Sequence, residues 1–175
     1  RLVGSEMCIR DRAGVISGGQ MKQDYGGGVS QVSTTLFNAA FFAGFDLDEH
    51  KAHSRYISRY PEGRETTLDY HSIDLKFTNN TDKPVVLDMY LEGGKVHARI
   101  LGVKTVDVEA DASSRFAYTS PSTIKGSGGS CTPQAPRQGW SIKIFRTIKE
   151  HGSGKVIKKD DFVTVYNPVH RVTCS

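Results

Sequence analysis

A glycine triplet leads directly into the most helix-like stretch of the sequence. Gly26, Gly27 and Gly28 precede a segment whose apolar residues recur with a helical period. Glycine reaches positive φ without a steric penalty, and the start of a helix exposes backbone N–H groups and a partial positive charge. Such a start can hold a carboxylate or phosphate, or stabilise a nucleophile and an oxyanion. Since glycine before a helix is also a common structural cap, the spacing leaves both interpretations open.

Residues 30–44 are predicted to form a mostly buried helix. Their apolar side chains share one face at a period of about 3.6 residues, and phenylalanines extend that surface around the cylinder. Ser30 is the candidate N-cap, and Gly44 stands where a C′ glycine commonly ends a helix. The apolar positions are Val32, Leu36, Phe37, Ala39, Ala40, Phe41, Phe42 and Ala43.

Beyond residue 54 the pattern predicts strands. Gly93-Gly94 separates two alternating runs, which is a hairpin signal. Trp140, Ile142, Ile144 and Ile148 share one face of a later strand that Arg146 interrupts, and a return strand is expected to include residues 162–166. The predicted fold class is therefore α+β: one buried helix packed on a mainly antiparallel β-sheet, with a C-terminal β-hairpin extension.

The expected organisation is one core, 13–104, and a β-rich extension of the same domain, 105–175. In the extension, residues 105–110 are a possible strand, and a stretch rich in Ser, Gly, Pro and Thr predicts a flexible loop at about 113–137. Residues 1–12 resemble a translated sequencing adapter and are excluded from fold reasoning. We therefore expect a parent protein with further N-terminal sequence.

Composition narrows the classes of partner. The 23 Lys and Arg against 19 Asp and Glu give a net charge of +4. The basic residues are scattered and have no interleaved aromatic platform, so nucleic-acid binding is not expected. No apolar run approaches the roughly 18 residues of a membrane span. Membrane association is expected only through an anchor that precedes this segment.

Two cysteines bracket the last predicted hairpin. Cys131 and Cys174 suggest a disulfide, the alternative being two unrelated buried thiols. Disulfides persist in oxidising compartments. Neither cysteine has the CxxC or HxxxH companion that a zinc site needs, and no metal or cofactor is predicted.

Residues 25–40 (YGGGVSQVSTTLFNAA) resemble the signature of the VanW family. Residues 53–55 (HSR), 60–67 (YPEGRETT) and 74–81 (DLKFTNNT) continue the resemblance in order, from about residue 13 to about residue 104. This family is named for a protein of vancomycin-resistance clusters. The resemblance implies an extracellular, cell-envelope protein, often membrane-anchored and preceded by peptidoglycan-binding-like domains. It implies no particular reaction.

The resemblance also suggests a candidate catalytic set. Many relatives have Cys where this chain has Ser30, an arrangement that would resemble papain or transglutaminase if a His and a carboxylate joined it. Here those residues would be His53 and Asp69 or Asp74. A helix dipole can activate a thiol, but a serine hydroxyl needs a well-placed general base. We therefore favour binding over catalysis. For His53, the alternative to a role in the site is a structural role as a hydrogen-bonded side chain.

Three functions follow from these patterns. The first is an envelope module that binds peptidoglycan or another carboxylate-bearing ligand at the glycine-rich helix start, with Arg55 or Arg64 presenting a guanidinium fork. The second is an acyl-transfer or amidase-type enzyme that uses Ser30 and His53. The third is a structural, partner-binding domain. The predicted ligand-binding residues are Gly26, Gly27, Gly28, Ser30, Gln31, Thr34, His53, Arg55 and Arg64.

Overall fold

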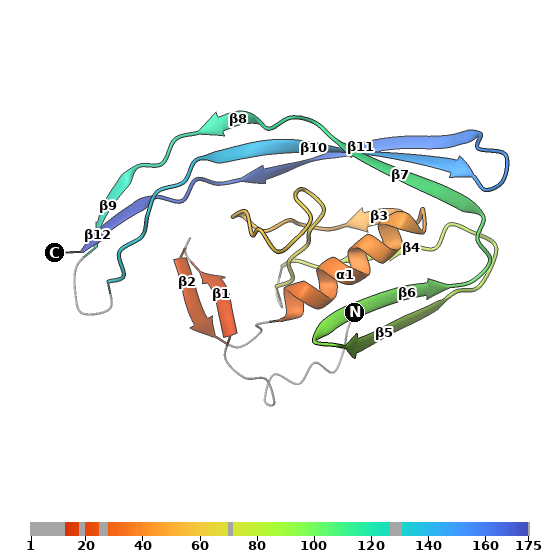
Figure 1. Ribbon diagram of the computed structural model, residues 1–175, viewed down its shortest axis with the longest axis horizontal. Coiled ribbons are helices and arrows are strands. Elements are labelled where there is room, and N and C mark those ends of the chain that lie inside the picture. The colour runs from red at the N-terminus through yellow and green to blue at the C-terminus, as the bar shows by residue number, and fades with distance from the viewer. Residues whose placement is uncertain (1–12, 18–19, 25–27, 70–71, 127–130, 175) are drawn as a thin grey trace.

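The computed structural model describes residues 13–17, 20–24, 28–69, 72–126 and 131–174. Within these residues the fold is mostly β, with one helix, α1 (Val29–Phe42). Figure 1 shows α1 between a long sheet, β7–β10–β11, and the β5–β6 hairpin. All strand pairs are antiparallel except β9 with β12, which are parallel.

The strands form five separate sheets in the described residues. Strand β8 joins the long sheet by pairing with β10, while β1–β2, β3–β4, β5–β6 and β9–β12 are two-stranded. The bounds are β1 Ala13–Ser17, β2 Gln20–Asp24, β3 Asp46–Glu49, β4 Lys76–Thr78, β5 Val86–Glu92, β6 Lys95–Leu101, β7 Val106–Ala112, β8 Phe116–Thr119, β9 Thr123–Gly126, β10 Gly139–Glu150, β11 Val156–Tyr166 and β12 Arg171–Cys174.

The start of α1 differs from the prediction. Gly28 is the N-cap, in a left-handed conformation with φ of 91°, and no side chain caps the helix. The Gly28 carbonyl accepts hydrogen bonds from the N–H groups of Gln31 and Val32. The prediction of Ser30 as N-cap is wrong, because glycine's freedom at positive φ lets the helix begin at Val29.

The predicted glycine, Gly44, lies just beyond the end of α1. Gly44 has φ of 77° and donates its N–H to the Phe41 carbonyl. The next residue, Phe45, donates to the Ala40 carbonyl. This pair of bonds is the Schellman motif, which satisfies carbonyls that the helix leaves unpaired.

Two short strands occupy part of the segment predicted to be a loop, 113–137. Strand β8 pairs with β10, and β9 pairs with β12. Both pairings join residues distant in sequence, so local composition does not reveal them. The Cys131–Cys174 disulfide, with a Cα–Cα distance of 5.8 Å, confirms the predicted staple beside this pair.

The hydrophobic core joins α1 to the long sheet. Phe37 and Phe41 of the helix are fully buried and cluster with Ile144 and Tyr166 of β10 and β11. The helix belongs to the predicted core and the two strands to the predicted extension, so the two parts share one apolar interior.

Arg146 lies inside this apolar face of β10 and is only 2% exposed. Its Nε and Nη2 donate to the two carboxylate oxygens of Asp160 at 2.8 and 2.6 Å. Its Nη1 donates to the Phe45 carbonyl at 2.9 Å, just beyond α1, and the guanidinium lies 5.1 Å from the centroid of the Phe41 ring. A cation is favourable at the C-terminal end of a helix, so Arg146 ties the sheet to the end of α1.

Asp160→Asn tests this ion pair through the pH dependence of stability. The hydrogen bonds from Arg146 hold the pKa of Asp160 below its usual range. A lowered folded-state pKa contributes stability above the ordinary Asp value that is lost as pH falls through the folded value. We expect Asp160→Asn to lower the free energy of unfolding at pH 7 by roughly 2–4 kcal/mol and to flatten its acid dependence below about pH 4. Urea denaturation measures both.

The matched control is Asp82→Asn, because Asp82 is exposed and pairs with the neighbouring, exposed Lys83. We expect a change below about 0.5 kcal/mol there. Equal losses in the two variants would contradict the role assigned to Asp160.

Candidate functional site

The first turn of α1 has neither a side-chain cap nor an acidic residue. Gly28, at the N-cap, is exposed. Within the described residues, the positive end of the helix dipole has no side-chain cap and no acidic residue in its first turn. Gln31 lies half-buried in the same turn. Gly26 and Gly27, which were predicted to share the site, lie outside the described residues.

Hydroxyl groups hold this end of the helix against residues 65–67 through hydrogen bonds. Ser33 Oγ donates to the Thr66 carbonyl at 3.0 Å. Thr34 Oγ1 donates to the same carbonyl at 3.0 Å and accepts the Thr66 N–H at 3.1 Å. Ser30 Oγ lies 3.5 Å from Thr67 Oγ1. Thr34 is thus occupied in packing, while the Ser30 and Thr67 hydroxyls lie next to the helix start.

His53 belongs to a buried polar network. Its Nδ1 lies 2.6 Å from Glu65 Oε2, and its ring stacks on Tyr60 with centroids 5.3 Å apart. The Tyr166 hydroxyl donates to Glu65 Oε1 at 2.7 Å and accepts the Gly63 N–H at 2.8 Å. Burial, followed by the hydrogen bond to Glu65, raises the pKa of Tyr166 well above its usual value. The phenol therefore stays protonated as a donor.

Glu65 is the carboxylate that orients His53. The Thr67 N–H donates to the Lys51 carbonyl at 2.8 Å, which joins the segment that carries Glu65 to the segment that carries His53. An imidazole held at one nitrogen by a carboxylate is the base–orienter arrangement of acyl-transfer enzymes. Sequence reasoning did not choose Glu65, although it lies in the segment 60–67 that carries the family resemblance.

The two aspartates proposed as orienters lie elsewhere. Asp69 is exposed, and its Oδ1 accepts hydrogen bonds from the backbone and hydroxyl of Ser72. Asp74 is exposed and lies 3.9 Å from Lys76 Nζ. The carboxylate that lies within hydrogen-bond distance of His53 is that of Glu65.

The two arginines predicted to bind a ligand have different hydrogen-bond partners. Arg64 donates to Asn38 Oδ1 and lies 5.0 Å from the Phe42 ring centroid. Asn38 is eight residues along α1 from Ser30, or about 12 Å, so Arg64 is not beside the helix start. Arg55 Nη2 donates to Gln134 Oε1 at 3.3 Å, which directs it toward the C-terminal segment.

No group of three or more His, Cys, Asp and Glu side chains that could hold a metal ion occurs in the described part of the chain. Among the residues that the structure describes, none belongs to a helix long and apolar enough to span a membrane.

Comparison with known proteins identifies the family. A family model described as VanW like protein matches residues 11–101, which contain α1, His53 and Glu65. This chain belongs to the VanW-like family. The VanW-like match ends at the close of β6, so strands β7 to β12 lie beyond it.

A curated relative supports the assignment. The VanW-like chain is 33% identical over 84 residues to "Uncharacterized protein YoaR" of Bacillus subtilis (strain 168). The aligned part covers 48% of this chain and 28% of the relative. No solved structure matches. These comparisons confirm the family resemblance.

Gly63→Ala tests how closely the network is packed against β10. Gly63 has φ of 76°, and a Cβ there would lie 2.5 Å from Ile144 Cδ1. Left-handed strain and overpacking together are expected to lower the free energy of unfolding by about 2–4 kcal/mol. The control, Gly154→Ala, has φ of 70° and open space around the added methyl group, so about 1 kcal/mol is expected. Equal losses of unfolding free energy in the two alanine variants would show that packing of Gly63 against Ile144 contributes nothing to the difference.

Glu65→Gln tests the buried network itself. Glu65 is 1% exposed and serves both His53 and Tyr166. An amide places a donor where one partner requires an acceptor, so we expect a loss of about 1–3 kcal/mol in the free energy of unfolding. Glu92→Gln, at an exposed position on the β5–β6 hairpin, should leave stability unchanged. Equal stability of both variants would contradict the network.

Proposed function

We propose that this VanW-like domain is a cell-envelope module that binds a carboxylate-bearing ligand, related to peptidoglycan, at the start of α1. The observation that carries the proposal is the exposed Gly28 N-cap, which has no side-chain cap and is followed by a first turn that contains no acidic residue. Backbone N–H groups at such a start favour an anion by roughly 0.3–1 kcal/mol. Useful affinity therefore needs further donors, which the hydroxyls of Ser30 and Thr67 supply.

An extracytoplasmic location is part of this proposal. The Cys131–Cys174 disulfide supports it, because such bonds persist mainly in oxidising compartments. Since Arg64 lies along the helix and Arg55 beside Gln134, the proposed site depends on backbone and hydroxyl groups rather than on an arginine clamp.

Calorimetry with a stem peptide tests the binding site. A peptide with a free terminal carboxylate should bind, and the same peptide with an amidated terminus should not. Ser30→Asp adds a carboxylate to the first turn, where acidic residues stabilise helices, so it should abolish binding without loss of fold. Thr132→Asp, at an exposed position, makes the same charge change and should preserve binding. Equal heats for both peptides, or full binding by Ser30→Asp, would refute the proposal.

The His53–Glu65 pair favours one second candidate, an acyl-transfer or amidase activity with Ser30 as nucleophile. Catalysis requires the Ser30 hydroxyl to come within about 2.6–3.2 Å of the free His53 nitrogen. Turnover of an activated ester such as 4-nitrophenyl acetate should then disappear in both Ser30→Ala and His53→Gln. Ser58→Ala, at an exposed serine, should leave it intact. Turnover that survives in Ser30→Ala would eliminate this candidate.

A further inference from the structure

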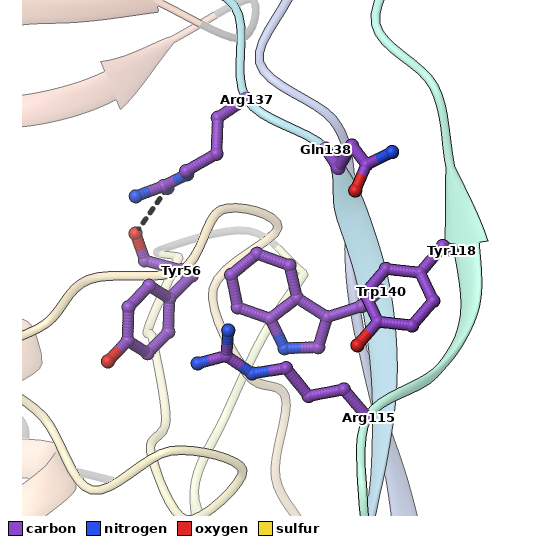
Figure 2. Close-up of a pocket in the computed structure, with 6 residues that line it drawn as sticks. All are labelled: Tyr56, Arg115, Tyr118, Arg137, Gln138 and Trp140. Carbon is purple, nitrogen blue, oxygen red and sulfur yellow. Dashed lines mark hydrogen bonds between the residues drawn. The ribbon is translucent and has the colours of Figure 1, made fainter.

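A hollow of about 340 Å³ lies between the loop around residue 56 and strands β8 and β10 (Figure 2). Tyr56 comes from the family-matched part of the chain, and the other lining residues come from the extension beyond it. The hollow thus exists only because the extension folds over the family domain. Its lining is Tyr56, Arg115, Tyr118, Arg137, Gln138 and Trp140.

Arginines and aromatic rings alternate around this hollow. The Arg115 guanidinium lies 4.1 Å from the Trp140 ring centroid, and the Arg137 guanidinium lies 5.5 Å from the Tyr56 ring centroid. The Tyr56 and Trp140 rings are themselves 5.2 Å apart. Cation–π contacts of this kind hold guanidinium groups in place at low entropic cost. Figure 2 shows both guanidinium groups beside the aromatic rings.

The two arginines differ in what they can still bind. Arg115 is neutralised, because its Nε and Nη2 each donate to a Glu62 carboxylate oxygen at 2.8 Å. Arg137 donates a hydrogen bond from Nη2 to the Tyr56 carbonyl at 2.7 Å. No carboxylate in the described part of the chain forms an ion pair with Arg137. Among the described residues, the two guanidinium groups of the hollow therefore differ: Glu62 neutralises Arg115, and no carboxylate neutralises Arg137.

We propose that this hollow binds a small carboxylate ligand, with the carboxylate on Arg137 and the body against Tyr56 and Tyr118. Guanidinium suits carboxylate because two N–H groups can donate in parallel. The volume lies at the low end of the range for ligand pockets, roughly 300–1,000 Å³, so the ligand is the size of a sugar acid or a dipeptide. This site is independent of the start of α1.

Trp140 is the sole tryptophan of the chain and lines this hollow, so its fluorescence is a probe of binding there. Two carboxylate probes are used, each with a neutral control. Glucuronate is compared with glucose, and N-acetyl-alanyl-alanine is compared with its C-terminal amide. We expect a saturable change in emission with at least one carboxylate and none with its neutral match. A response to glucuronate alone identifies sugar acids as the source, and a response to the dipeptide alone identifies peptide termini. Equal responses to charged and neutral probes, or no response, would overturn the proposal.

Arg137→Gln should weaken binding of the responding probe about 10- to 100-fold, as expected for loss of charged hydrogen bonds. Tyr118→Ala removes a 58% exposed side chain without disturbing the core and should weaken binding several-fold. Arg99→Gln, which makes the same charge change at the Asp88 ion pair on the β5–β6 hairpin, should bind normally. Thermal unfolding verifies that each variant folds.

Ser30→Asp separates this site from the one at the helix start. It should leave the Trp140 response unchanged even where it abolishes stem-peptide heats. Normal binding by both Arg137→Gln and Tyr118→Ala would overturn the hollow as the site, and loss of the Trp140 response in Ser30→Asp would place the ligand at α1 instead.

Discussion

Burial of one face of α1 against β10 is the interaction on which the rest of the structure depends. Phe37 and Phe41 are fully buried against Ile144 and Tyr166, and each such ring contributes roughly 1.5–3 kcal/mol relative to exposure. This contact joins the family-matched segment to strands that lie beyond the match. Without it neither the His53 network nor the Trp140 hollow would be assembled, because each draws residues from both parts.

Buried polar groups then make this packing specific. A carboxylate without partners is costly inside a protein, and Glu65 is satisfied by His53 on one side and Tyr166 on the other. Arg146 is satisfied in the same way by Asp160 and by carbonyls at the end of α1. These contacts allow one alignment of the helix on the sheet, since a shift would leave charged groups unpaired.

The two proposed binding sites use different physics. The start of α1 offers backbone N–H groups and the hydroxyls of Ser30 and Thr67, and its first turn contains no acidic residue. The Trp140 hollow offers a guanidinium held over aromatic rings, beside a second guanidinium already neutralised by Glu62. An anion is proposed for both sites, and the lining of the hollow adds the rings of Tyr56 and Tyr118 for the body of a ligand.

Local patterns in the sequence determined the helix, the glycine that ends it, the Gly93-Gly94 hairpin and the cysteine pair that forms the disulfide. The VanW signature likewise identified the family, because short motifs depend on neighbouring residues alone. The same patterns also selected His53, though not its partner.

Tertiary structure alone decided that Glu65 rather than an aspartate holds His53, that Arg146 points into the core, and that Arg64 lies far along α1. It also formed β8 and β9 within a predicted loop. Each of these outcomes requires contacts between residues distant in the chain, and neither periodicity nor composition encodes which distant groups meet when the apolar faces pack.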